Sequence, residues 1–584
     1  MGKRSNSQPA AERQTAGLAG PSKSAPLTYE FSEKSIADDV SGISLRRIAD
    51  ESCIASLESM SRPRPEQLIE LGQSPLTMVN SNNELQRLTT WPHQVWLDYW
   101  EPSPTTDLVL CSPASELHYF GQILCCHLLI CDPIDNPIRH VTVAQVRTSA
   151  LYNALLKYLT AEYLNKTIIN EEAQSVLNIA RIDTIVHLES IVSQKSNSAA
   201  KESLLALIMF GLAASWDGSN NTGVYYYRHA VSMYSQTGAR MSLKDRRFFE
   251  EALTYWWSGL TFVTDATVDR LSNPPKTPSN DDAAVDSRAK VLPVNPHPLT
   301  GVSPKSCELM GKVGRLIYRQ RSLALEQAFF SIAAIRVQEQ MLRESQQLEE
   351  ELRTLQIPMV EDVCTTYDAN TPAVDMCNAS EVSRLCSLLL LYRCFPDLLR
   401  DRLAQGGVQE PTALERYMSR FALHALHVLE RNGATSRTRS VEQILLVIIA
   451  SELRLPNQLC SPSFPVVSHD AWLVPEPSTT MFMSALGDTS LLSALDCNAL
   501  QSTLVDPRMC EIMVDDGVDV QTQNIVAARA IVSARMSAVR RILPYKSVEQ
   551  AEELIWNVWS KSDNGEKSFW MDNMIRNGQR FVMV

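Results

Sequence analysis

Residues 116–131 read ELHYFGQILCCHLLIC, and residues 132–140, which follow them, read DPIDNPIRH. Apolar residues in the first stretch recur at steps of three and four, which places them on one face of an α-helix. They are Leu117, Phe120, Leu124, Leu128 and Cys131. Asp132-Pro133 is predicted to end this helix, because proline lacks an amide hydrogen and disfavours a helical conformation in the residue before it.

The same helical period continues along the chain. A second helix is predicted after the turn, with Leu151, Leu155 and Leu159 on its apolar face. Alternating apolar and polar residues, which are typical of strands, are almost absent, and only residues 581–584 suggest a short extended segment. The sequence therefore predicts an all-α fold, built as a large multi-helix bundle or a curved helical array.

Three helix starts carry a capping box, in which a hydroxyl side chain and a Glu or Gln three residues later satisfy free amides of the first turn. The pairs are Thr412 with Glu415, Ser440 with Gln443, and Ser547 with Gln550. The last two pairs share the tetrapeptide SVEQ, but their flanking sequences differ, so no internal repeat is predicted. Asn432-Gly433 is predicted to end the helix that Thr412 begins, with a residue in the left-handed conformation.

The composition predicts one large folded domain behind a tail. The chain has 584 residues, of which 45% are hydrophobic and 21% charged, as in ordinary globular proteins. Residues 1–85 are rich in Pro, Ser, Gln and Gly and are predicted to be mostly disordered. Residues 86–584 are predicted to form one all-helical domain, with loops near 272–304 and 455–524 where Pro, Asn, Ser and Asp accumulate.

Charge and cysteine content exclude several classes of protein. A net charge of −12 argues against a surface that coats DNA, because phosphate binding needs clustered Lys and Arg. The thirteen cysteines include no CxxC pair, which indicates buried free thiols in a reducing compartment. No apolar run approaches the roughly 20 residues that span a bilayer, so no membrane partner is predicted.

The C-terminal run at residues 555–584, IWNVWSKSDNGEKSFWMDNMIRNGQRFVMV, contains aromatic, acidic and glycine landmarks. These landmarks are Trp556, Trp559, Asp563, Trp570, Gly578 and Phe581. Upstream are DNPIRH at 135–140, YYYRHAV at 225–231, Trp256-Trp257, HPLTG at 297–301 and an extended helical stretch, 323–355, closed by Pro358. In this order, the landmarks resemble the fungal-specific transcription factor domain, the regulatory body of zinc-cluster transcription factors.

The resemblance implies a fungal transcriptional regulator or coactivator in the nucleus, which controls a metabolic pathway or gene cluster and is not an enzyme. Its body would hold the protein inactive or respond to a metabolite or a partner. Proteins of this kind usually begin with a six-cysteine zinc cluster, whereas residues 1–110 here contain one cysteine, Cys53. We therefore expect DNA to be reached indirectly, through a DNA-binding transcription factor or the transcription machinery, unless a zinc-cluster exon precedes Met1.

Two groups of residues in the sequence are candidate metal ligands. Cys125, Cys126 and His127 lie near Cys131, but successive residues of a helix point about 100° apart, and Cys131 continues the apolar stripe. The pair His424 and His427 lies within the helix predicted after Thr412, near its hydrophobic face. The sequence therefore predicts core or surface packing for both groups, and it predicts no metal, cofactor or catalytic site.

Asp281, Asp282 and Asp286 suggest the aspartate-rich motif of an all-α lyase of the terpene-synthase kind, in which carboxylates hold magnesium over a diphosphate. Prolines surround these aspartates, so a loop is predicted rather than the rigid helix that this chemistry needs. A helical scaffold or adaptor unrelated to transcription is the main alternative function. The lyase is the weaker alternative.

Two segments have a second interpretation. Residues 487–524 contain seven acidic residues, one arginine and interspersed leucines; a loop insertion is favoured over an activation surface. The stretch from Ala324 to Leu355 has apolar residues near heptad spacing, which is compatible with a homodimeric coiled coil. Gln338 and Ser345 interrupt that seam, so packing within the domain is favoured.

Overall fold

The structure is a computed structural model. It describes residues 120–133, 136–167, 171–194, 200–218, 220–264, 271, 273–274, 293–326, 331–366, 368, 370–405, 413–433, 435–455, 518–543, 545–566 and 568–583. The chain divides into two units, Met1–Ser81 and Asn82–Val584, and every described residue belongs to the second. The predicted tail, residues 1–85, and most of the predicted loop at 455–524 lie outside the described residues.

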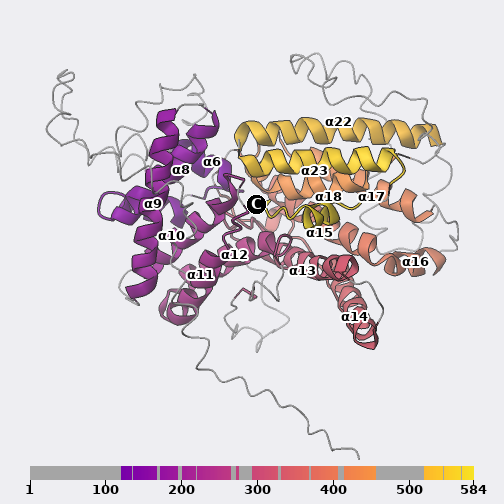
Figure 1. The fold of residues 1–584 in the computed structure, drawn as a ribbon, viewed down its shortest axis with the longest axis horizontal. Helices are drawn as coiled ribbons and strands as arrows, with labels where there is room; N and C mark the ends of the chain where they lie inside the picture. Colours follow the sequence, from indigo (N-terminus) through magenta and orange to yellow (C-terminus); the bar gives the residue numbers. More distant parts are fainter. Residues whose placement is uncertain are drawn as a thin grey trace, which may run out of the picture. The chain divides into compact units, whose positions relative to one another are not determined.

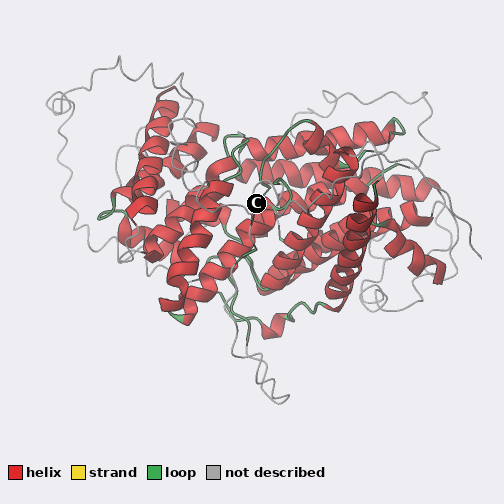
Figure 2. Ribbon diagram, turned by 60° about the horizontal axis from the view of Figure 1, so that its bottom comes forward, coloured by secondary structure: helices red, strands yellow, loops and turns green. Residues whose placement is uncertain are grey.

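All regular secondary structure in the described ranges is helical, which confirms the predicted all-α class (Figure 2). Extended pairing there is limited to two isolated bridges, Val294 with Val363 and His297 with Gly301. The predicted extended segment at the C-terminus forms no bridge over residues 581–583. Its side chains Phe581, Val582 and Met583 are instead buried in the core.

The first helices pack around the turn that the sequence singled out. Their bounds are η4 (Phe120–Leu124), α6 (Cys125–Leu128), α7 (Pro137–Gln145), α8 (Ala150–Thr167), α9 (Glu171–Gln194) and α10 (Ala200–Leu212). The predicted end of the first helix was wrong, because Leu129 is already extended, with φ −106° and ψ 139°. The helix predicted beyond the turn is α8, which buries Leu151, Leu155 and Leu159, and α7 is a further helix before it. Asn136 caps α7 and Pro137 occupies its first turn, where a proline costs no hydrogen bond.

The middle of the chain supplies the next set of helices. They are η5 (Ala213–Ser215), α11 (Val224–Thr237), η6 (Gly238–Arg240), α12 (Leu243–Leu260), α13 (Pro304–Glu326) and α14 (Ile332–Thr354). The long helix predicted over 323–355 was wrong. A new helix starts at Ile332, because the Ser331 hydroxyl accepts a hydrogen bond from the Ala334 amide at 3.1 Å and caps α14.

Helix α14 packs within its own domain along its C-terminal half. Met341, Leu348 and Leu352 are buried against α13 and α15, as the favoured prediction required. Ile332 and Ile335, at the other end of the helix, are 72% and 46% exposed.

The remaining helices form the C-terminal part of the fold. They are η8 (Val360–Asp362), α15 (Ala373–Cys394), α16 (Pro396–Gln405), α17 (Ala413–Glu430), η9 (Arg437–Val441), α18 (Glu442–Glu452), α22 (Val518–Ile542), α23 (Lys546–Asp563) and α24 (Trp570–Arg576). Helix α18 is buried on every side, and α22 and α23 lie next to each other along their lengths (Figure 1). The predicted loop ended too late, because α22 starts at Val518 and buries Gln521 and Ile525.

Two of the predicted capping boxes are absent, and the Thr412 of the third lies outside the described residues. Val441 precedes α18 without a side-chain cap, and Ser440 belongs to the 3-10 turn η9. The Gln443 side chain instead donates from Nε2 to the Ser547 carbonyl at 3.0 Å, so the two SVEQ segments contact each other. Likewise α23 starts at Lys546 without a side-chain cap. Gly433 also lacks the predicted left-handed conformation.

The C-terminal landmarks fasten the last helices to the core. Trp559 donates from its indole nitrogen to the Ala450 carbonyl at 2.8 Å, and Arg529 lies over its ring. Arg529 also binds both carboxylate oxygens of Asp563, at 2.7 and 2.8 Å. Trp570 is fully buried. These contacts and this burial give Trp559, Asp563 and Trp570 structural roles.

Candidate functional site

A buried cluster of ionised side chains joins the first helices to the C-terminal ones. Asp132 is 0% exposed and forms an ion pair with Arg139. Arg437, from η9, places Nη1 3.4 Å from Asp132 Oδ2 and 3.1 Å from Asp368 Oδ2. Two arginines and two aspartates thus neutralise one another where water is excluded, which buried charges require.

The DNPIRH turn builds one side of this cluster. Asn136 accepts a hydrogen bond from the Ile138 amide at 3.0 Å and donates from Nδ2 to Asp132 Oδ1 at 2.9 Å. The Asp132 amide donates to Asp368 Oδ2 at 3.1 Å. One asparagine therefore caps α7 and positions the buried carboxylate. In this motif, Asn136 and Arg139 have structural roles, and Asp135 lies outside the described residues.

The HPLTG turn lies close to this ion cluster, and hydrogen bonds hold the imidazole of His297 in one orientation. Nδ1 of His297 accepts hydrogen bonds from the amides of Leu299 and Thr300 at 3.1 and 3.3 Å, so the proton is on Nε2. Nε2 then donates to the Phe248 carbonyl at 3.1 Å. Gly301 closes the turn with φ +66°, a conformation that favours glycine. Burial lowers the pKa of His297 and keeps the ring neutral.

The two histidines weighed as metal ligands lie on α17. His424 is 7% exposed and His427 is half-buried. Burial, followed by the positive charges on His427, Arg431 and Arg384, lowers the pKa of His424 to about 4. The described residues contain no group of three His, Cys, Asp or Glu side chains placed to hold a metal ion.

Acidification should destabilise the protein through His424. The unfolded chain binds this proton with a pKa near 6.5 and the folded protein with a pKa of about 4, so stability is present above pH 6.5 and is lost as the pH falls. Between pH 7.5 and 5 the free energy of unfolding should fall by about 2 kcal/mol from this residue alone. Urea unfolding at the two pH values measures the change. The His424→Gln variant is the control, since it should lose about 2 kcal/mol less over that interval; equal losses in both proteins would contradict the assignment.

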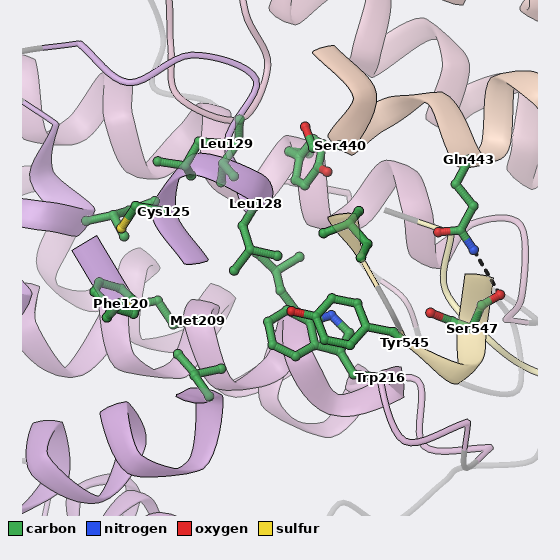
Figure 3. Close-up of a pocket in the computed structure, with 16 residues that line it drawn as sticks. Phe120, Cys125, Leu128, Leu129, Met209, Trp216, Ser440, Gln443, Tyr545 and Ser547 are labelled. Atoms are coloured by element: carbon green, nitrogen blue, oxygen red, sulfur yellow. Dashed lines mark hydrogen bonds between the residues drawn. The ribbon is translucent and has the colours of Figure 1, made fainter. Parts of the chain in front are cut away.

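A cavity of about 70 Å³ lies next to the ion cluster, where η4, α6 and α10 face η9, α18 and the segment between α22 and α23 (Figure 3). Its described lining is largely apolar. The lining residues are Phe120, Cys125, Leu128, Leu129, Ile138, Leu159, Met209, Leu212, Trp216, Tyr255, Leu299, Ser440, Gln443, Leu543, Tyr545 and Ser547.

Stacked aromatic rings form one wall of the cavity. Trp216 and Tyr545 have centroids 4.1 Å apart and planes within 13° of parallel (Figure 3). The Lys546 amide donates to the Trp216 carbonyl at 3.0 Å, which fixes the start of α23 against the end of η5. The opposite wall includes Ser440, whose side chain is 4% exposed and whose Oγ has no hydrogen-bond partner among the described residues.

The cavity and the ion cluster are built from the same two stretches of chain. Residues 125–132 supply Cys125 and Leu128 to the cavity and Asp132 to the cluster, and residues 437–443 supply Ser440 and Arg437. A change in one site therefore displaces backbone that forms the other. The sequence analysis identified Cys125 and the capping residues but neither the cavity nor the pairing with Arg437.

The cysteines considered as metal ligands, as far as the structure describes them, are buried in the core. Cys125 and Cys131 lie in the core, as expected, and Cys131 donates from Sγ to the His297 carbonyl at 3.5 Å. Burial raises the pKa of the Cys131 thiol well above its usual value. The side chains of Cys126 and His127 lie outside the described residues, as do the three aspartates at 281, 282 and 286.

The family of the chain is shown by comparison with known proteins. The family model described as "Fungal specific transcription factor domain" matches residues 142–454. No curated protein and no solved structure matched the chain. Among the described helices, none combines the length and apolar character needed to cross a membrane.

Proposed function

The chain belongs to the fungal-specific transcription factor domain family, and from this premise we propose that it regulates a metabolic pathway or gene cluster from the nucleus. The family is regulatory rather than catalytic, so the chain is a transcriptional regulator. The match over residues 142–454 carries the proposal. It includes η9, which supplies Arg437 to the ion cluster, and the HPLTG turn close to that cluster.

We propose that the regulatory domain extends beyond the matched residues on both sides. Asp132 precedes the match and pairs with Arg437 within it. Ser547 follows the match and accepts a hydrogen bond from Gln443 within it. These contacts support one regulatory domain over the predicted range 86–584. In this domain, the pairs Asp132–Arg437 and Gln443–Ser547 connect the first and the last helices to the matched region.

Access to DNA is proposed to be indirect. The net charge of −12 opposes association with phosphates, which need clustered Lys and Arg. A DNA-binding transcription factor, or the transcription machinery, would then place the regulator at promoters. Its output would come from protein contacts rather than from base recognition.

Deletion of the gene in its fungal host should change a restricted set of transcripts, and re-expression of the full chain should restore them. A fluorescent fusion should be nuclear, and chromatin immunoprecipitation should enrich the promoters of that set. An unchanged transcriptome would favour the alternative of a helical scaffold without a link to transcription. Tight, sequence-specific binding of a DNA duplex by the purified chain alone would reject indirect access.

A further inference from the structure

We infer that the cavity beside the ion cluster binds a small uncharged molecule that has an apolar body and one hydrogen-bonding group. The inference rests on the proposed function, since such a ligand would act as an effector of the regulator. It would lie between the first helices and the C-terminal ones, and it would stabilise the contact between them. The argument follows from the lining, the size and the position of the cavity.

The lining selects against charge. None of the described lining side chains is an acid, a lysine, an arginine or a histidine. An ionic ligand would therefore lose its hydration without gaining a counter-charge, which is costly in an apolar site. Leu128, Leu159 and Leu212 would contact the apolar body of the ligand.

Ser440 supplies the polar contact. Its hydroxyl is buried at the edge of an apolar space, and no described residue satisfies it. A buried hydroxyl without a partner costs free energy, and a ligand group that donates to it or accepts from it recovers that loss. Gln443 is already committed through its Nε2 to the Ser547 carbonyl, so Ser440 is the anchor of the site.

The size of the cavity favours a short ligand. An engineered apolar cavity of about 150 Å³ in another protein holds benzene, whereas this one is about 70 Å³. The aliphatic part of the ligand should therefore be smaller than benzene, with three or four carbon atoms in the enclosed space. The hydrogen-bonding group of the ligand would then reach Ser440 at the edge.

A second cavity nearby offers no unpaired anchor. It measures about 60 Å³, and Tyr255 and Leu299 line both cavities. Its hydroxyl groups have partners in the protein: Thr300 Oγ1 donates to Glu251 at 2.9 Å, and the hydroxyls of Ser303 and Ser306 lie 2.9 Å apart. No described hydroxyl of its lining is both buried and without a partner, whereas Ser440 in the first cavity is. The first cavity is therefore the one that suits a ligand with a hydrogen-bonding group.

The position of the cavity means that a bound ligand would stabilise the contact between distant parts of the chain. The cavity wall includes Trp216, which follows η5, and Tyr545 at the start of α23. Their stacked rings join parts of the chain that are far apart in sequence. A ligand that contacts both sides binds the assembled joint and not the separated one. By mass action it therefore raises the stability of the assembled state.

The test uses the purified full chain with 2-methylpropan-1-ol as the probe and 2-methylpropanoate as its charged counterpart at pH 7.5. The alcohol should give saturable transfer of magnetisation in ligand-observed NMR and raise the unfolding temperature by about 1–2 °C near ten times its Kd. The carboxylate should do neither. Ser440→Ala should weaken binding of the alcohol about fivefold to tenfold, since it removes one hydrogen bond.

A second variant, Leu212→Phe, fills the cavity and should abolish saturable binding, with circular dichroism confirming that both variants fold. Equal affinity for the alcohol and the carboxylate, or unchanged binding in both variants, would overturn the inference. The proposed function is tested separately. Altered transcripts after deletion with no binding of the alcohol reject the ligand site alone, and binding with an unchanged transcriptome rejects the proposed function alone.

Discussion

Replacing Arg437 with methionine should lower the free energy of unfolding by about 3–5 kcal/mol, because it leaves buried carboxylates without their partner. Asp368 would lose the ion pair that Arg437 makes to it at 3.1 Å, and Asp132 would keep only Arg139. Methionine retains most of the volume of the arginine stem, so the loss reports the charge rather than a cavity. Urea unfolding of the full chain measures the change.

Two matched variants separate this effect from a general response to losing an arginine. Arg343→Met removes a pair with Glu339 in which the side chains are 76% and 60% exposed, and it should cost under about 0.5 kcal/mol. Adding Asp368→Asn to Arg437→Met should recover part of the loss, since it removes the uncompensated charge. If Arg437→Met lowers the free energy of unfolding as little as Arg343→Met does, the ion cluster does not stabilise the contact between the first helices and the C-terminal ones.

The helical class was predictable because helical periodicity is local. The stripe through Phe120, Leu124 and Leu128 depends on residues within one or two turns, and the structure buries Phe120 and Leu124 as predicted. Helix ends were less predictable, because distant parts of the chain compete for the same side chains. Gln443, predicted to cap its own helix, is instead hydrogen-bonded to Ser547 on another helix.

The candidate site was not predictable from spacing. The amide of Asp132 and the carboxylate of Asp368 are 236 positions apart, and no local pattern marks them as partners. The same holds for the stacking of Trp216 on Tyr545. The motif DNPIRH served only as a landmark of the family, and its role in the cluster depends on Arg437 and Asp368, which lie far away in the sequence. The unsatisfied hydroxyl of Ser440 follows from the failure of the capping box predicted for it.

Substituting alanine for Gly211 should destabilise the protein by about 3 kcal/mol or more, at the upper end of the cost of overpacking. A Cβ on Gly211 would lie 2.1 Å from Cη2 and Cζ2 of Trp256, far inside van der Waals contact. The indole is fully buried, with the ring of Tyr227 edge-on at 5.3 Å, so it has no free space into which to move. The displaced α10 would also shift Met209 and Leu212 in the cavity wall.

Thermal unfolding followed by circular dichroism tests this prediction, with Gly121→Ala as the matched control. An ideal Cβ on Gly121 meets nothing within 4 Å, so that substitution should be neutral or slightly stabilising. Combining Gly211→Ala with Trp256→Phe should restore part of the stability, because the smaller ring vacates the contested space. A Gly211→Ala protein as stable as the unchanged chain would mean that α10 and α12 do not approach as closely as Trp256 requires. In that case the wall that α10 gives to the cavity would be placed differently.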